Sequence, residues 1–203
     1  MQVVLPEATE SAKLILDPPR MLNDDDYYAF CLANPDLRIE RSAQGEIIIV
    51  APVGGESSYR SGESYAELRA WAKRDKRGKA FDCSAEFLLP TGAALSPDSA
   101  WVSNDKLAKL TKEQRKKFLR LSPEFVIEVM SPSDRLGAAK GKMAEWIAGG
   151  VELGWLIDGD RQTIYIYRAG RKQPEKRVGI ESLAGEGPVA GFELDLTEIW
   201  EGL

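Results

Sequence analysis

The pattern of apolar and polar positions divides the chain into short strands and a few helices. The most apolar stretch, residues 124–130, alternates its side chains between two apolar faces, which is typical of a central strand covered on each side. Residues 135–149 instead carry an apolar stripe at helical spacing, which includes Leu136, Met143 and Trp146. A strand, a helix and a further strand in this order imply at least one parallel pair of strands.

Shorter runs predict the remaining elements. Strands are expected where apolar or β-branched residues lie between turn residues: 37–40, 46–51, 80–89, 99–102, 153–157 and 163–167. Helices are expected at about 24–33, at 59–73 and within 104–122. Residues 1–22 are predicted to be a leader and the stretch from about 174 to the end an irregular wrap. Residues 23–203 then form a single α/β domain (an α+β mixed sheet) flanked by helices.

The histidine count restricts the chemistry most, because the chain contains no histidine. Histidine-activated nucleophiles, HExxH zinc sites, two-histidine iron sites and histidine-dependent nucleases are therefore excluded. A metal site would need oxygen ligands, which favours Mg²⁺, Mn²⁺ or Ca²⁺. The net charge of −5 argues mildly against a constitutive nucleic-acid binder, although local basic patches can still hold phosphates.

Composition also bears on location. The chain has two cysteines, no run long enough to span a bilayer, and an N-terminus without the pattern of a signal peptide. We therefore expect a cytoplasmic protein that has no membrane association.

Two acidic residues are the main candidates for chemistry. Glu128 interrupts the apolar row of the predicted central strand, where an isolated carboxylate is costly and needs a partner or a proton. It is either a metal or catalytic residue, or one half of a buried ion pair near the strand end. Asp98 begins the strand at 99–102 and alone would be a common turn acceptor. If the two strands are neighbours, the carboxylates converge and favour a cation between them.

A lysine would complete such a site. Lys142 lies on one flank of the apolar stripe of the helix at 135–149, and Lys140 lies on the other. Either side chain could bury its stem and bring its ammonium to the end of the preceding strand, where it would orient a water or neutralise a phosphate. The alternative for each lysine is a solvated position on the helix flank.

Several segments together resemble the Uma family, a group of restriction-endonuclease-like proteins in the PD-(D/E)XK nuclease superfamily. They are Ser96-Pro97-Asp98, the run Pro-Glu-Phe-Val-Ile-Glu-Val-Met-Ser-Pro-Ser-Asp-Arg at 123–135, Lys142-Met143-Ala144-Glu145-Trp146, Gly150-Val151 and Gly154-Trp155-Leu156-Ile157-Asp158. The resemblance covers residues 25–200 approximately. It implies a restriction-endonuclease-like core, with a central mixed β-sheet flanked by helices and a metal-dependent phosphodiesterase site.

The resemblance also assigns residues. Asp98 matches the first aspartate of the motif and Glu128 its second acid, and the carbonyl after that acid, here Val129, would be a further ligand for Mg²⁺ or Mn²⁺. The chain departs from the superfamily motif at Met130, where a lysine is usual. The family instead places a lysine in the following helix, which matches Lys142. Two acids of the helix at 59–73 are expected as additional ligands: Glu63 and Glu67.

Three functions are compatible with these residues. The first is a divalent-metal-dependent endonuclease acting on nucleic acid, with DNA as the first choice and a homodimer as its expected assembly. The second is an inactive nucleic-acid-binding or protein-interaction module that keeps the fold, since Met130 and the acidic net charge both weaken the case for turnover. The third, a hydrolase of other phosphate esters, has no pocket signature in the sequence.

Overall fold

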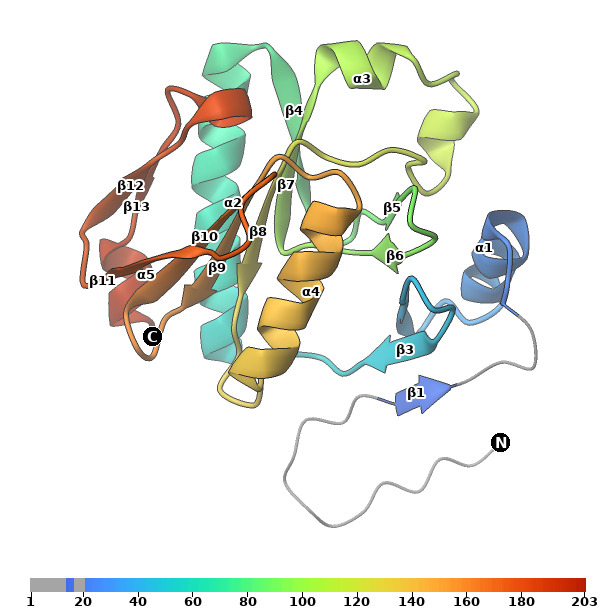
Figure 1. The fold of residues 1–203 in the computed structure, drawn as a ribbon, viewed down its shortest axis with the longest axis horizontal. Helices are drawn as coiled ribbons and strands as arrows, with labels where there is room; N and C mark the ends of the chain where they lie inside the picture. The colour runs from blue at the N-terminus through green and yellow to red at the C-terminus, as the bar shows by residue number, and fades with distance from the viewer. Residues whose placement is uncertain (1–13, 17–20) are drawn as a thin grey trace.

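Six strands form the central sheet of the protein, in the order β11-β10-β9-β8-β7-β4 (Figure 1). The structure is a computed structural model that describes residues 14–16 and 21–203. The bounds of the strands are Gly78–Asp82 for β4, Ser99–Ser103 for β7, Phe125–Val129 for β8, Leu153–Asp158 for β9, Thr163–Arg168 for β10 and Glu175–Val178 for β11. Strands β8 and β9 are parallel, whereas the other neighbours are antiparallel. The mixed sheet and its parallel pair are therefore confirmed.

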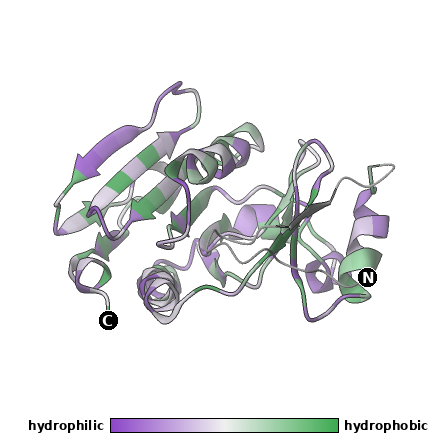
Figure 2. Cartoon of the chain, turned by 90° about the horizontal axis from the view of Figure 1, so that it is seen from below, coloured by the Kyte–Doolittle hydropathy of each residue, from purple (hydrophilic) through white to green (hydrophobic). Residues whose placement is uncertain are grey.

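Two helices cover opposite faces of this sheet, as the apolar faces of the central strand require. Helix α2 (Gly55–Asp75) packs Leu68 and Trp71 into the core that contains Ile127. Helix α4 (Leu136–Ala148) packs Met143 and Trp146 into the core on the other face, which contains Val126. Figure 2 shows that hydrophobic residues colour much of these strands and of the helix surfaces that face them.

A second sheet of five strands lies at the N-terminal end of the molecule, in the order β1-β3-β2-β6-β5 (Figures 1 and 2). Its strands are Leu14–Leu16 (β1), Arg38–Arg41 (β2), Ile47–Val50 (β3), Phe87–Leu88 (β5) and Ala94–Leu95 (β6). Helix α1 (Asp24–Leu32) packs Tyr27 against this sheet, and the Asn23 side chain caps the helix by accepting from Asp26 N at 2.9 Å. The predicted hairpin is confirmed, because β2 and β3 pair in antiparallel register.

Three expectations about regular structure were wrong. The stretch 80–89 is two strands, since β4 and β5 are separated by a turn and belong to different sheets. Most of 104–122 is not helical: α3 (Asn104–Ala108) and the 3₁₀ turn η1 (Gln114–Lys116) are short, and apolar residues outside them, among them Leu119 and Leu121, pack against the core from irregular backbone. Helix α2 also begins at Gly55, four residues before the predicted start.

The C-terminal stretch is more regular than predicted. Beyond β11 it contains β12 (Ser182–Ala184), the 3₁₀ turn η2 (Gly187–Val189), β13 (Glu193–Asp195) and α5 (Thr197–Glu201). Its buried side chains, among them Phe192 and Ile199, extend the core that α2 covers, so this segment is ordered by packing.

The predicted leader falls largely outside the described residues, which exclude 1–13 and 17–20. The one part described, Leu14–Leu16, pairs with β3 as an edge strand of the N-terminal sheet. In the part of the chain that the structure describes, no helix is long and apolar enough to cross a membrane.

Candidate active site

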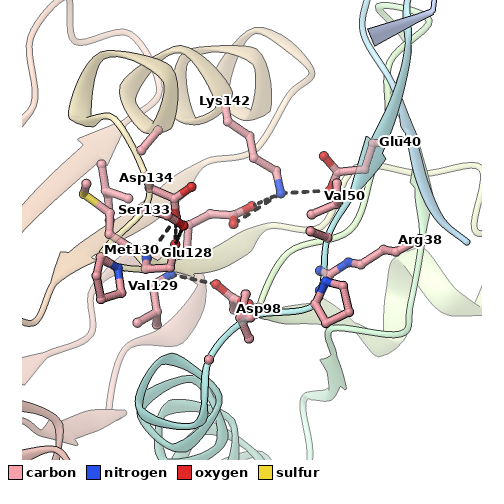
Figure 3. Close-up of a pocket in the computed structure, with 18 residues that line it drawn as sticks. Arg38, Glu40, Val50, Asp98, Glu128, Val129, Met130, Ser133, Asp134 and Lys142 are labelled. Carbon is pink, nitrogen blue, oxygen red and sulfur yellow. Dashed lines mark hydrogen bonds and ion pairs between the residues drawn. The ribbon is translucent and has the colours of Figure 1, made fainter. Parts of the chain in front are cut away.

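A cavity of about 280 Å³ opens between the N-terminal sheet and the C-terminal end of β8. Glu128 and Val129 end β8, the loop 130–134 follows them, and α4 contributes Lys142. The opposite wall consists of β2 and the segment 50–54, which leads into α2. Figure 3 shows charged side chains from these elements directed toward one another across the cavity.

Glu128 lies in this wall and is 8% exposed. Its Oε1 accepts a hydrogen bond from Trp146 Nε1 at 2.7 Å and lies 3.0 Å from Lys142 Nζ. Burial raises the pKa of Glu128 to about 7, although Lys142 opposes the shift. A buried carboxylate requires partners, and those of Glu128 are therefore an ammonium and an indole, both from α4.

Asp98 enters the site from the start of the neighbouring strand. Strands β7 and β8 pair with Ser99 opposite Ile127, which places Asp98 at the same edge of the sheet as Val129. Its Oδ2 accepts from the Val129 backbone N at 2.7 Å. Burial raises the pKa of Asp98, and the hydrogen bond from Val129 and the charges of Lys142 and Arg38 oppose that shift. The expectation that Asp98 and Glu128 belong to neighbouring strands is confirmed.

Lys142 reaches the end of β8 from helix α4. Its Nζ donates to Glu40 Oε1 at 2.9 Å and to the Ser96 carbonyl at 2.9 Å, and it forms an ion pair with Glu128. Burial alone would lower the pKa of Lys142, but the two glutamates raise it above its ordinary value. The ammonium thus remains charged and uses all three of its donors on protein groups.

Glu40, on strand β2, was missed by the sequence reasoning. It is 3% exposed, and besides Lys142 it accepts from the Ser96 backbone N at 3.2 Å. The available signal was a charged residue within a short strand, but the run Arg38-Ile39-Glu40-Arg41 has charges on both strand faces. The pattern therefore did not indicate which charge was buried or that β2 would meet α4.

Three other predicted residues do not join this cluster. Lys140 lies over the ring of Tyr165, with Nζ 4.3 Å from the ring centroid, because it projects from the other flank of α4. Glu67 accepts from the Asp195 backbone N at 2.9 Å and so faces the C-terminal segment. Glu63 lies on the same helix and does not line the cavity. Of the predicted lysines, only Lys142 lines the cavity and pairs with Glu128.

The donor set suits a hard cation that keeps part of its water shell. Asp98 and Glu128 offer carboxylate oxygens beside the cavity, and Val129, which also lines it, has a backbone carbonyl; this is the oxygen-only chemistry that Mg²⁺ and Mn²⁺ accept. Among the described residues, no three acidic or cysteine side chains gather closely enough to form a metal cage. The arrangement therefore fits an ion held by few protein ligands.

Comparisons with known proteins bear on the family and the fold. A family model described as "Uma2: Putative restriction endonuclease" matches residues 24–197. A similar solved structure is described as the crystal structure of a "putative nuclease belonging to DUF820" from Anabaena variabilis ATCC 29413. It is 19% identical in sequence with a TM-score of 0.68, covering 80% of this chain and 89% of that one, a likeness that shows the fold. No curated protein matches the chain. Since the family model spans most of the sequence, the chain belongs to the Uma2 family of restriction-endonuclease-like proteins.

Proposed function

We propose that this protein is a divalent-metal-dependent nuclease that hydrolyses phosphodiester bonds of nucleic acid, with DNA as the first substrate to test. One observation carries the proposal: Asp98, Glu128 and Lys142 meet at one cavity although they come from three different elements. Convergence of two acids and a lysine on accessible space is an arrangement that supports metal-assisted phosphodiester hydrolysis.

Asp98, Glu128 and the Val129 carbonyl would hold Mg²⁺ or Mn²⁺. Such an ion, when bound, supplies Lewis-acid stabilisation of the negative charge on a phosphate. The hydrogen bond from the Val129 N–H fixes one oxygen of Asp98, and the Trp146 indole fixes one oxygen of Glu128. These bonds hold both carboxylates in place before substrate arrives, so little rearrangement is needed at the moment of reaction.

Lys142 would act on the substrate side of the site. Its ammonium sits between Glu40 and Glu128, and exchanging one of these contacts for a phosphate oxygen or a water would bring positive charge to the reacting group. A lysine in α4 thus performs the task that Met130 cannot, because Met130 has no charge and packs in the core with Met143. A homodimer and a cytoplasmic location remain predictions beside this assignment.

The decisive experiment is a cleavage assay with purified protein. Supercoiled plasmid, single-stranded DNA and RNA are incubated with Mg²⁺, Mn²⁺ or EDTA, using wild type, Asp98→Asn and the control Asp36→Asn. Asp36 is an exposed acid outside the cavity, so its variant controls for the loss of one charge. Metal-dependent cutting by wild type and Asp36→Asn, but not by Asp98→Asn, is the expected result. Equal cutting by all three would contradict the assigned site.

One observation favours a second function, a binding module without turnover. All three donors of Lys142 are used by the protein, and Met130 occupies the usual lysine position of the motif. If this holds in solution, the protein binds nucleic acid or another protein and cuts nothing. Binding of labelled DNA without any cleavage under every metal condition would support the module, whereas site-dependent cleavage would remove it.

A further inference from the structure

The cavity contains an excess of acidic groups, which a phosphate-bearing substrate would meet unfavourably. Four acids line it: Glu40, Asp98, Glu128 and Asp134. Of the described lining residues, only Arg38 and Lys142 carry positive charge. Because the three donors of Lys142 are already used, Arg38 is the cationic residue of this lining that can contact an incoming anion without rearrangement.

Arg38 reaches the cavity through the alternation of strand β2. Side chains two positions apart share a strand face, so Arg38 and Glu40 both line the cavity while Arg41 turns away to bond Leu22 and Gly92. Figure 3 shows the Arg38 side chain extending from β2 toward the side of the cavity where Asp98 lies. The position of this guanidinium is therefore fixed by the strand rather than by a flexible loop.

The guanidinium of Arg38 is short of partners. Its Nε is buried and has no hydrogen-bond acceptor, and no ion pair joins Arg38 to an acid within the residues described. A buried donor without an acceptor is costly, so such a group generally has an acceptor in some functional state. The other arginines of the N-terminal sheet region behave differently: Arg41 bonds Asp24, and Arg120 bonds Asp25.

An alternative is that Arg38 only balances the charge of the acids around it. Its charge does lower the pKa of Asp98 and of Glu86, although burial outweighs it at both. That role needs no hydrogen bond and leaves the buried Nε of Arg38 without an acceptor. A planar group with five donors matches the oxygens of a phosphate, and it does so better than a lysine ammonium does.

We propose that Arg38 binds a backbone phosphate of the nucleic-acid substrate beside Asp98. The inference rests on the proposed function, because it takes nucleic acid as the ligand of this cavity. It assigns Arg38 to substrate binding and leaves Asp98, Glu128 and Lys142 in the roles given above. The N-terminal sheet then contributes one residue that contacts substrate, Arg38, and one that positions the lysine, Glu40.

Binding of a short fluorescein-labelled DNA duplex, followed by anisotropy across a salt series, tests the proposal. The assay is run with Ca²⁺ and separately with EDTA, and intact duplex is verified on a gel. The variants are Arg38→Met, Arg38→Lys and the control Arg171→Met, which removes an exposed arginine outside the cavity. Thermal unfolding of each variant verifies that the fold is retained.

Arg38→Met is expected to weaken binding by about tenfold or more, since a hydrogen bond to a charged group is lost. The slope of log K against log salt should fall by about one in Arg38→Met, and stay near the wild-type value in Arg38→Lys. A merely structural role would not change that slope. Equal affinity and slope for wild type and Arg38→Met, or no duplex binding by wild type in either buffer, would overturn the inference.

The two proposals fail separately. If wild type binds the duplex through Arg38 and yet cuts no nucleic acid, the nuclease activity is refuted and the phosphate-binding role stands. If wild type cuts DNA and Arg38→Met both binds and cuts it equally well, the role of Arg38 is refuted and the nuclease stands.

Discussion

The molecule has two buried clusters of charged and polar residues, and only one of them lies at an accessible cavity, as a binding or catalytic site must. In the cavity, Glu128 faces Lys142 and open space; beside the N-terminal sheet, Glu86 accepts from the Tyr27 hydroxyl at 2.5 Å and does not line that cavity. Burial raises the pKa of each glutamate to about 7. A buried acid with a raised pKa is thus insufficient to identify a site, which also needs an accessible cavity and convergent groups.

The largest effect is expected for Asp98→Asn. We expect cleavage to fall by roughly 100-fold or more, because one charged ligand of the metal is lost. The free energy of unfolding should stay the same or rise, because burial raises the pKa of Asp98 and the neutral amide removes the cost of that charge. Steady-state cleavage rates and denaturant melts measure the two quantities. A large loss of stability would mean that Asp98 is structural.

Lys142→Met is expected to lower both the cleavage rate and the free energy of unfolding. Glu40 and Glu128 lose their shared counter-ion, so unfolding should become easier by about 3 kcal/mol, and cleavage should fall by about 100-fold. Adding Glu40→Gln to this variant should restore part of the stability and none of the cleavage. Lys140→Met is the matched control on the same helix, and its cleavage should equal that of wild type; a loss there would contradict the choice of lysine.

Glu40→Gln is expected to have an intermediate effect. Glu40 acts through Lys142, so we expect about a tenfold loss of kcat with little change in KM. The measurement is a Michaelis–Menten series on one labelled substrate. If KM rises while kcat is unchanged, Glu40 contributes to substrate binding instead of to the position of the ammonium.

Glu86→Gln should have the smallest effect on cleavage, within about twofold of wild type, since Glu86 does not line the cavity. Its main effect should be on how the free energy of unfolding depends on pH. The folded-state pKa is raised from 4.5 to about 7, so the folded protein retains a proton that the unfolded chain releases. Glu86 therefore contributes nothing unfavourable to the free energy of unfolding below pH 4.5, where both states hold the proton. The folded state loses stability relative to that as pH rises through about 7, where the buried carboxyl must ionise.

The variant should therefore be more stable than wild type at about pH 8, and the difference should shrink at about pH 5. Urea melts at the two pH values measure it. A difference of opposite sign would indicate that Glu86 is held as an ionised partner of the neighbouring arginines.

The local pattern of apolar and polar residues predicted the central sheet, because this pattern depends directly on which side chains are buried. The apolar residues on both faces of 124–130 required a covered central strand, and Asp98 and Glu128 were found because each is a carboxylate at the border of such a strand. Glu40 escaped because its partner Lys142 is 102 residues away, and no local pattern encodes that pairing. The break within 80–89 was missed for a similar reason, since one apolar run supplies strands to two sheets.

The distance in sequence between Glu40 and Lys142 also has a consequence for folding. The pair joins strand β2 of the N-terminal sheet to helix α4 and cannot form until the two have docked, and closing so long a loop delays it relative to local contacts. The lysine of the proposed site would therefore be placed only at a late stage of folding. A nascent or partly unfolded chain would have its strands and acids before the lysine reached them, so the proposed cleavage activity would appear only once the fold was complete.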